Sequence, residues 1–243
     1  MNSTDPDAGA RDAAMEFAHT LAPIWQAAIG QELLGLYLIG SLAHGGFSRR
    51  YSDIDVAVIT ETGLTLQTLD TLRRQATAVS ADWGPKVSVF WTDRQFCVGR
   101  FPPLDRLDYL DRPVVLAERE RVMPARPRLQ EIRDYLRGGP FTNWATRARE
   151  FADAATLDAK DRKGYLRALL YPARFCFSYV TGQMSSNDDA VAYLHQHTPA
   201  GLDLDSIERA LQCRQAAADP DSLFDLRSRL PAQVDACAAL LAP

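Results

Sequence analysis

The sequence lacks the features that would point to a membrane or a nucleic acid as partner. Its 27 Lys and Arg residues stand against 31 Asp and Glu residues, a formal net charge of −4, so no overall positive field attracts nucleic acid. No apolar run approaches the ~20 residues that a membrane-spanning helix needs. The acidic beginning, MNSTDPDAGARDAAMEF, has no apolar core of the signal-peptide type. We therefore expect a cytoplasmic protein that binds neither membranes nor nucleic acid.

Cysteine is also scarce. The four cysteines are far apart, none belongs to a CxxC pair, and none has a histidine at metal-ligand spacing (Cys97, Cys176, Cys213 and Cys237). This pattern predicts free thiols in a reducing compartment. With 243 residues, 47% of them hydrophobic, the chain is long enough for two modest domains or one large domain.

The first half of the chain alternates between helical and strand patterns. Residues 13–29 carry apolar side chains at intervals of three and four, which predicts a helix that ends at Gly30. The apolar run LLGLYLIG and the alternating segment DIDVAVIT predict two strands joined by a loop. Residues 64–80 place leucines on one helical face, and KVSVFW predicts a third strand. This order predicts an α/β fold with a mixed sheet and flanking helices.

The second half contains helical patterns only, after the proline-containing connector VMPARPRL. We expect helices near residues 127–137, 142–156, 161–181, 186–196, 203–217 and 220–240. The third of these is apolar on most sides, which predicts the buried centre of a helical bundle, with a kink at Pro172. The predicted organisation is an α/β domain over residues 1–122, followed by an all-α helical bundle domain over residues 123–243.

Two carboxylates in the second predicted strand have the chemistry of a metal site. Asp53 and Asp55 are two positions apart, so on a strand their side chains point to the same face and lie near enough to share cations. Such hard oxygen ligands suit Mg²⁺, which usually keeps coordination positions open for substrate phosphates.

The loop before these aspartates has the composition of a phosphate-binding turn. Gly40 removes the side chain at a point where the backbone would approach a triphosphate. Ser41 can donate both its hydroxyl and its backbone N–H at the start of a short helix. Arg49 and Arg50 add two cations for charge-assisted contacts.

A Gly-Ser after a strand, followed about a dozen residues later by Asp-x-Asp in the next strand, resembles the nucleotidyltransferase superfamily, which includes DNA polymerase beta and the antibiotic-adenylating enzymes. The resemblance implies that Asp53 and Asp55 are the catalytic, metal-binding pair. It matches Gly40 and Ser41 to the phosphate-binding turn, and Ser52 to the serine commonly placed before the first aspartate. It further implies transfer of a nucleotidyl group, AMP, from Mg-ATP to a hydroxyl of a small molecule, with two Mg²⁺ ions in an active enzyme.

The sequence departs from this family at one position. These enzymes generally carry a third carboxylate on the following core strand, as a metal ligand or as the general base. Here the position falls on Ser88 when the apolar neighbours guide the alignment, and on Lys86 when the similar adenylyltransferases guide it. A lysine would repel cations but could hold a phosphate, which adds Lys86 to the predicted nucleotide-binding residues. We interpret Asp93 as an exposed turn residue that would replace the acid only if the strand were shifted.

The second half of the chain resembles the helical domain of aminoglycoside 3''-adenylyltransferases, through Arg174 and the segment Tyr179–Gly182 at the end of the central helix. In those enzymes acidic and aromatic side chains meet the amines of the antibiotic. Gly164 stands where an acid is expected, so the acceptor is left open between aminoglycosides and other small-molecule hydroxyls.

Two other functions agree with the same residues. A catalytically impaired nucleotide-binding sensor, or pseudoenzyme, is favoured by Lys86 and Ser88 at the position of the acid. A protein-modifying nucleotidyltransferase or antitoxin is the third reading, although its small standalone forms normally lack so large a helical domain. His44 is interpreted as a loop histidine with no functional role, with a phosphate contact as the alternative.

Overall fold

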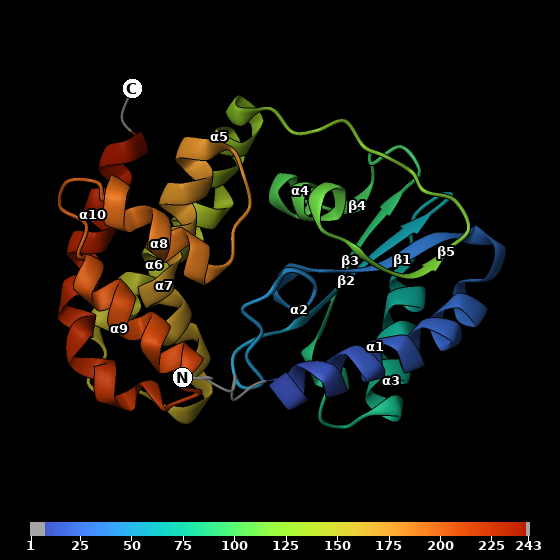
Figure 1. Ribbon diagram of the computed structural model, residues 1–243, viewed down its shortest axis with the longest axis horizontal. Coiled ribbons are helices and arrows are strands. Elements are labelled where there is room, and N and C mark those ends of the chain that lie inside the picture. The colour runs from blue at the N-terminus through green and yellow to red at the C-terminus, as the bar shows by residue number, and fades with distance from the viewer. Residues whose placement is uncertain (1–7, 242–243) are drawn as a thin grey trace. The chain divides into compact units, whose positions relative to one another are not determined.

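The computed structural model describes residues 8–241, and the chain divides into two compact units, one up to Pro127 and the other from Arg128 (Figure 1). The first unit contains, in chain order, α1 (Ala8–Ile29), β1 (Leu33–Ile39), α2 (Gly40–His44), β2 (Ile54–Thr60), α3 (Leu66–Val79), β3 (Val87–Asp93), β4 (Gly99–Arg100), α4 (Pro103–Asp111) and β5 (Val114–Glu118). Short 3₁₀ turns precede β1 (Gly30–Glu32) and β3 (Gly84–Lys86). Within residues 8–241, no helix is long and apolar enough to cross a membrane.

The strands form one mixed sheet in the order β4-β3-β2-β1-β5. β2 and β3 are parallel, whereas β1 is antiparallel to both β2 and β5, and β4 is antiparallel to β3. The predicted mixed sheet with flanking helices is therefore confirmed. β1 and β2 are buried along almost their whole length, as expected for central strands covered on both faces.

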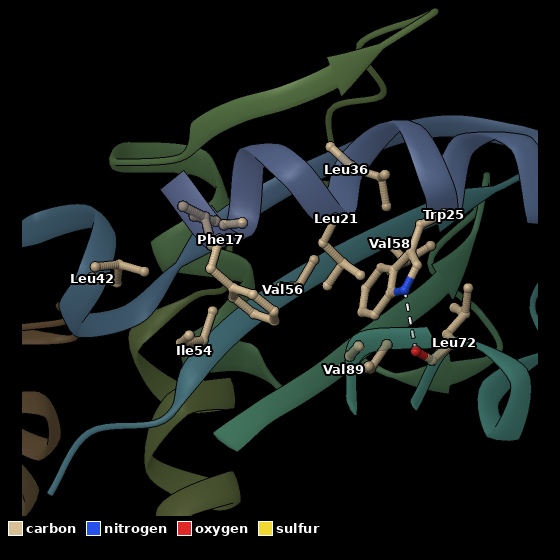
Figure 2. Close-up of a cluster of buried hydrophobic side chains, with 14 of the residues drawn as sticks. Phe17, Leu21, Trp25, Leu36, Leu42, Ile54, Val56, Val58, Leu72 and Val89 are labelled. Atoms are coloured by element: carbon tan, nitrogen blue, oxygen red, sulfur yellow. Dashed lines mark hydrogen bonds between the residues drawn. The ribbon is translucent and has the colours of Figure 1, made fainter. Parts of the chain in front are cut away.

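One face of the sheet is covered by α1 and α3, which carry the main core of this unit. Alternate residues of β2, such as Val56 and Val58, meet α1 residues such as Leu21 and Trp25 in one buried cluster (Figure 2). The Trp25 indole N–H donates to the Leu72 carbonyl oxygen in α3 (3.2 Å), which satisfies its buried polar atom.

The opposite face of the sheet is covered by α4, which lies across the sheet from α1 and α3 in Figure 1. Here Tyr37, Ile39, Ala57 and Ile59 from β1 and β2 pack with Tyr109 of α4. The Tyr37 and Tyr109 rings meet edge to face with centroids 4.9 Å apart. These aromatic contacts fix α4 against the middle of β1.

The second unit consists of helices in the described residues: α5 (Leu129–Arg137), α6 (Gly139–Asp153), α7 (Arg162–Thr181), α8 (Asn187–His197), α9 (Leu204–Gln215), a 3₁₀ segment (Pro220–Arg229) and α10 (Leu230–Leu241). α7 packs against α5, α6, α8, α9 and α10, so the prediction that it is the buried centre is confirmed. Pro172 lies inside α7 without interrupting it, and Gly182 ends it in the left-handed conformation (φ +70°).

The last predicted helix, residues 220–240, is instead two elements. Residues 220–229 form a 3₁₀ segment, and the regular helix begins only at Leu230. Pro231 has no N–H to continue a helix from the preceding turn, but it is tolerated in the first turn of a new helix.

Candidate nucleotide-binding site

The loop from Gly40 to Asp53 joins β1 to β2 at one end of the sheet. Ile39, the last residue of β1, is the register partner of Asp55 in β2, so the loop begins and ends beside that aspartate. Asp53 lies one residue before β2. Because alternate strand residues share a face, Asp55 lies on the same face as Ala57, which is the face covered by α4.

Gly40 and Asp55 lie so close together that any side chain at position 40 would force the Asp55 carboxylate or the turn to shift. Gly40 has φ +70°, in the left-handed region, and a Cβ added to it would lie 2.3 Å from Asp55 Oδ2. The chain therefore brings a bare backbone turn against the carboxylate of the predicted metal-binding pair. Only glycine combines this backbone conformation with this contact.

Serine hydroxyls hold the rest of the loop in shape. The Ser41 hydroxyl donates to the Ser52 hydroxyl oxygen (3.0 Å), which also accepts from the Ser48 backbone N–H (2.9 Å). The Ser52 N–H in turn donates to the Ser48 carbonyl oxygen (2.8 Å). Ser48 and Ser52 are both buried, so Ser52 fixes the loop from the inside and lies against Ser41.

Three cations lie along the same loop and the turn before β3. The Arg49 guanidinium and the Lys86 ammonium both lie over the Trp83 ring, 5.8 and 5.3 Å from its centroid. Lys86 also donates to the Arg49 carbonyl oxygen and so ties the turn before β3 to the loop. Arg50 lies over the Tyr51 ring (5.4 Å). The structure thus brings Arg49 and Lys86 together.

Ser88 is the residue of β3 that lies beside Asp55. The parallel register of β2 and β3 pairs Ile54 with Val87 and Asp55 with Ser88. Lys86 precedes the strand, in the 3₁₀ turn, so it does not share the strand position of Ser88. The strand residue next to Asp55 is therefore a neutral hydroxyl.

Asp93 lies at the other end of β3, where it pairs with Thr60. The interpretation of Asp93 as an exposed turn residue is wrong, because it is buried and accepts hydrogen bonds from the backbone N–H groups of Cys97 (2.7 Å) and Val98 (3.1 Å). Burial alone would raise the pKa of Asp93, but these backbone donors outweigh it and hold the pKa below its usual value. Asp93 shapes the turn after β3 and does not replace the missing acid.

Sequence reasoning missed one carboxylate that lies against the turn. Asp108 of α4 accepts a hydrogen bond from the Gly40 backbone N–H (Oδ2, 2.7 Å), and its Oδ1 is 3.3 Å from His44 Nε2. His44 ends α2 and its side chain is 4% exposed, so it is not the loop residue we expected. A sequence signal for α4 exists in Pro102-Pro103, since proline favours the first turn of a helix.

The protein ligands available to a cation are few. Among the described residues, no group of three or more His, Cys, Asp and Glu side chains is arranged to hold a metal ion. Asp53 and Asp55 lie where the loop joins β2, and a cation bound there would take its other ligands from phosphate oxygens or water.

Comparisons with known proteins identify the fold. No family model matches the sequence, and no curated protein is similar to it. Among solved structures, the chain is similar to spectinomycin adenyltransferase AAD(9) from Enterococcus faecialis, solved with ATP and spectinomycin, with a TM-score of 0.67 and 14% sequence identity over 92% of this chain and 99% of that one. The predicted nucleotidyltransferase fold followed by a helical part is confirmed, and the chain has the fold of that adenyltransferase.

Proposed function

We propose that the protein is a nucleotidyltransferase that binds Mg-ATP and transfers AMP to a hydroxyl group of a small molecule. The observation that carries this proposal is the close approach of the Gly40 turn to the Asp55 carboxylate, which a side chain at position 40 would displace. A turn built this closely against a carboxylate suits a triphosphate that is bridged to the protein by a cation. The similarity in fold to an adenyltransferase solved with ATP supports the same function.

The residues at the site fit a divalent cation. Mg²⁺ is usually bound through one or two carboxylates together with substrate phosphates, so Asp53 and Asp55 are sufficient protein ligands. Glycine at position 40 lets the turn lie directly against this carboxylate, since an added Cβ would be 2.3 Å from Asp55 Oδ2. When bound, the metal would neutralise the triphosphate and polarise the α-phosphate.

The other residues of the loop would hold the phosphates. Gly40 and Ser41 would line the triphosphate, and Ser52 would keep Ser41 in place through their hydrogen bond. Arg49, Arg50 and Lys86 would balance the phosphate charge. In the reaction, the acceptor oxygen forms a bond to the α-phosphorus, the bond between the α- and β-phosphates breaks, and pyrophosphate leaves.

The proton of the acceptor hydroxyl has no assigned base, because the strand residue beside Asp55 is Ser88. Loss of a general base typically lowers a rate by ~10²–10⁴. Positioning and electrostatic stabilisation supply most of the catalysis of phosphoryl transfer, so we expect slow transfer rather than none.

The neutral Ser88 beside Asp55 favours a second function, a nucleotide-binding sensor without transfer activity. Such a protein needs the two aspartates and the turn to bind Mg-ATP, but it needs no general base, so Ser88 would not impair its function. The two functions differ in one measurable respect, which is the release of pyrophosphate.

The surroundings of Gly164 bear on the acceptor. A Cβ at this position would lie 3.5 Å from the Phe151 ring and 3.9 Å from the Arg147 guanidinium, which pairs with Glu150 and Asp161. Position 164 itself carries no carboxylate, and Asp161 is paired with Arg147. The set of acceptors to test therefore includes neutral polyols as well as aminoglycosides.

The test is incubation with α-labelled ATP and Mg²⁺ across such a panel. Labelled product and pyrophosphate should form with at least one acceptor, and Asp55→Asn should reduce both to background. Asp70→Asn is the matched control, because Asp70 is an exposed carboxylate in α3 that pairs with the exposed Arg73. Mg-dependent ATP binding in calorimetry without turnover would establish the sensor, and absence of ATP binding would refute both functions.

A further inference from the structure

Gly40 is contacted by two carboxylates from different elements. Asp55 of β2 lies against its Cα, and Asp108 of α4 accepts a hydrogen bond from its backbone N–H at 2.7 Å. The second contact joins residues that are 68 positions apart in the chain. The turn is therefore held not only by its own loop but also by a helix that covers the sheet.

Asp108 is well suited to hold a fixed position. Its side chain is 4% exposed, and a buried carboxylate is tolerated only when it receives hydrogen bonds or faces a cation. Its neighbours in α4, Leu107 and Tyr109, are fully buried, and the Tyr109 hydroxyl donates to the Val122 carbonyl oxygen (2.7 Å). The helix is thus anchored on both sides of Asp108, and the acceptor of the Gly40 N–H cannot easily move away.

Asp108 is not a replacement for the missing base. One of its oxygens accepts from Gly40 and the other lies 3.3 Å from His44 Nε2, so both are engaged inside the protein. His44 is equally buried and lies against Asp108, and its ring nitrogens make no hydrogen bond of good geometry to the described residues. A general base must reach the acceptor hydroxyl, and neither side chain is exposed to one.

We propose that Asp108 is a positioning residue for nucleotide binding: it fixes the Gly40–Ser41 turn, with His44 packed against it, in the conformation that receives the triphosphate of Mg-ATP. This inference rests on the proposed function. The turn would otherwise have to be ordered at each binding event, at a cost to affinity. Asp108 acts through the backbone N–H of Gly40 and does not touch the nucleotide.

The experiment compares Mg-ATP affinity, measured by calorimetry, in the full chain and in three variants. Asp108→Ala removes the acceptor of the Gly40 N–H, whereas Asp108→Asn keeps an oxygen acceptor and removes the charge. Asp93→Ala is the matched control, because Asp93 is also a buried carboxylate that accepts from backbone N–H groups, but at the opposite end of β3. Hydrogen exchange of the segment 40–44 is followed in each variant.

We expect Asp108→Ala to weaken Mg-ATP binding by about 10-fold or more, because it removes the acceptor of the Gly40 N–H. Asp108→Asn should stay within about 3-fold of the unmodified chain, because it keeps an acceptor, although a neutral acceptor contributes less than a charged one. Exchange of the segment 40–44 should rise in Asp108→Ala and stay unchanged in Asp93→Ala. If Asp108→Ala does not fold, Asp108→Asn decides through its exchange and affinity, since a loss as large as that of Asp55→Asn would contradict a positioning role.

The two possible failures are distinguishable. If the unmodified chain binds Mg-ATP and a folded Asp108→Ala variant binds it equally well, this inference alone is overturned. The same holds if Asp93→Ala loses as much affinity as Asp108→Ala, because the loss would then reflect general destabilisation. No Mg-ATP binding by the unmodified chain overturns the proposed function, and the positioning role falls with it.

Discussion

The substitution Gly40→Ala tests the contact on which the proposed function depends. It adds one methyl group at a residue with φ +70°, directly against the Asp55 carboxylate. We expect two separate effects, a loss of stability from the backbone conformation and a loss of activity from the displaced carboxylate.

Both effects can be given a magnitude. The left-handed conformation costs a residue with a Cβ about 1–2 kcal/mol. The added Cβ would lie 2.3 Å from Asp55 Oδ2, whereas ordinary contact begins at 3.4 Å, so carboxylate and turn must separate by about 1.1 Å. A misplacement of ~1 Å at a reacting centre can lower a rate by ~10². The rate of pyrophosphate release should therefore fall about 100-fold, and stability in urea unfolding by somewhat more than 1–2 kcal/mol.

Gly30→Ala is the matched control for the backbone effect. Gly30 has nearly the same conformation (φ +67°), but nothing lies within 4 Å of an added Cβ, and it precedes the other end of β1. It should lose stability to a similar extent and keep its activity. Equal activity losses in the two variants, or a Gly40→Ala variant that retains full nucleotide affinity and rate, would refute the assignment of Asp55.

Three further predictions concern other parts of the first unit. Thr65→Ala removes the side-chain cap that accepts from the Thr68 N–H at the start of α3, and should cost about 1 kcal/mol in thermal unfolding without changing ATP affinity. Asp93→Asn should flatten the acid limb of the stability curve: the lowered pKa of Asp93 contributes stability above its unfolded value, and that contribution is lost as the pH falls through the folded value, below about 4. Ser88→Asp places a carboxylate beside Asp55 and should raise the transfer rate by up to ~10²–10⁴ if the missing base limits it; an unchanged rate would place the limitation elsewhere.

Local patterns in the sequence predicted the elements with strong periodicity. β1, β2 and β3 alternate or are continuously apolar, and their positions were predicted within a few residues. β5 (Val114–Glu118) and α4 (Pro103–Asp111) were missed, because β5 is a half-buried edge strand next to charged residues and α4 is short. The partner of β5 is β1, about 80 positions earlier in the chain, which no local window contains.

The candidate site divides in the same way. The proximity of the Gly40 turn to Asp55 could be predicted because their spacing along the chain is short and fixed by the loop, whereas the metal-binding role of Asp53 and Asp55 stays a prediction. Asp108 could not, because its contact with Gly40 spans 68 positions and its own segment resembles an ordinary amphipathic helix with acidic residues. The predicted roles of Arg49, Arg50 and Lys86 remain predictions, while the structure adds that Lys86 holds the carbonyl of Arg49.

Two buried carboxylates, Asp93 and Asp108, perform the same physical task at opposite ends of the sheet, since each accepts a backbone N–H that would otherwise be unsatisfied. Only Asp108 lies beside the turn that faces Asp55, and it lacks a free oxygen for proton transfer. Neither Asp93 nor Asp108 therefore supplies the acid absent at Ser88. A carboxylate restored at Ser88 would face a like charge at Asp55, so Mg²⁺ should stabilise Ser88→Asp against unfolding more than it stabilises the unmodified chain. An equal Mg²⁺ effect in the two proteins would show that the added carboxylate does not join a cation site beside Asp55.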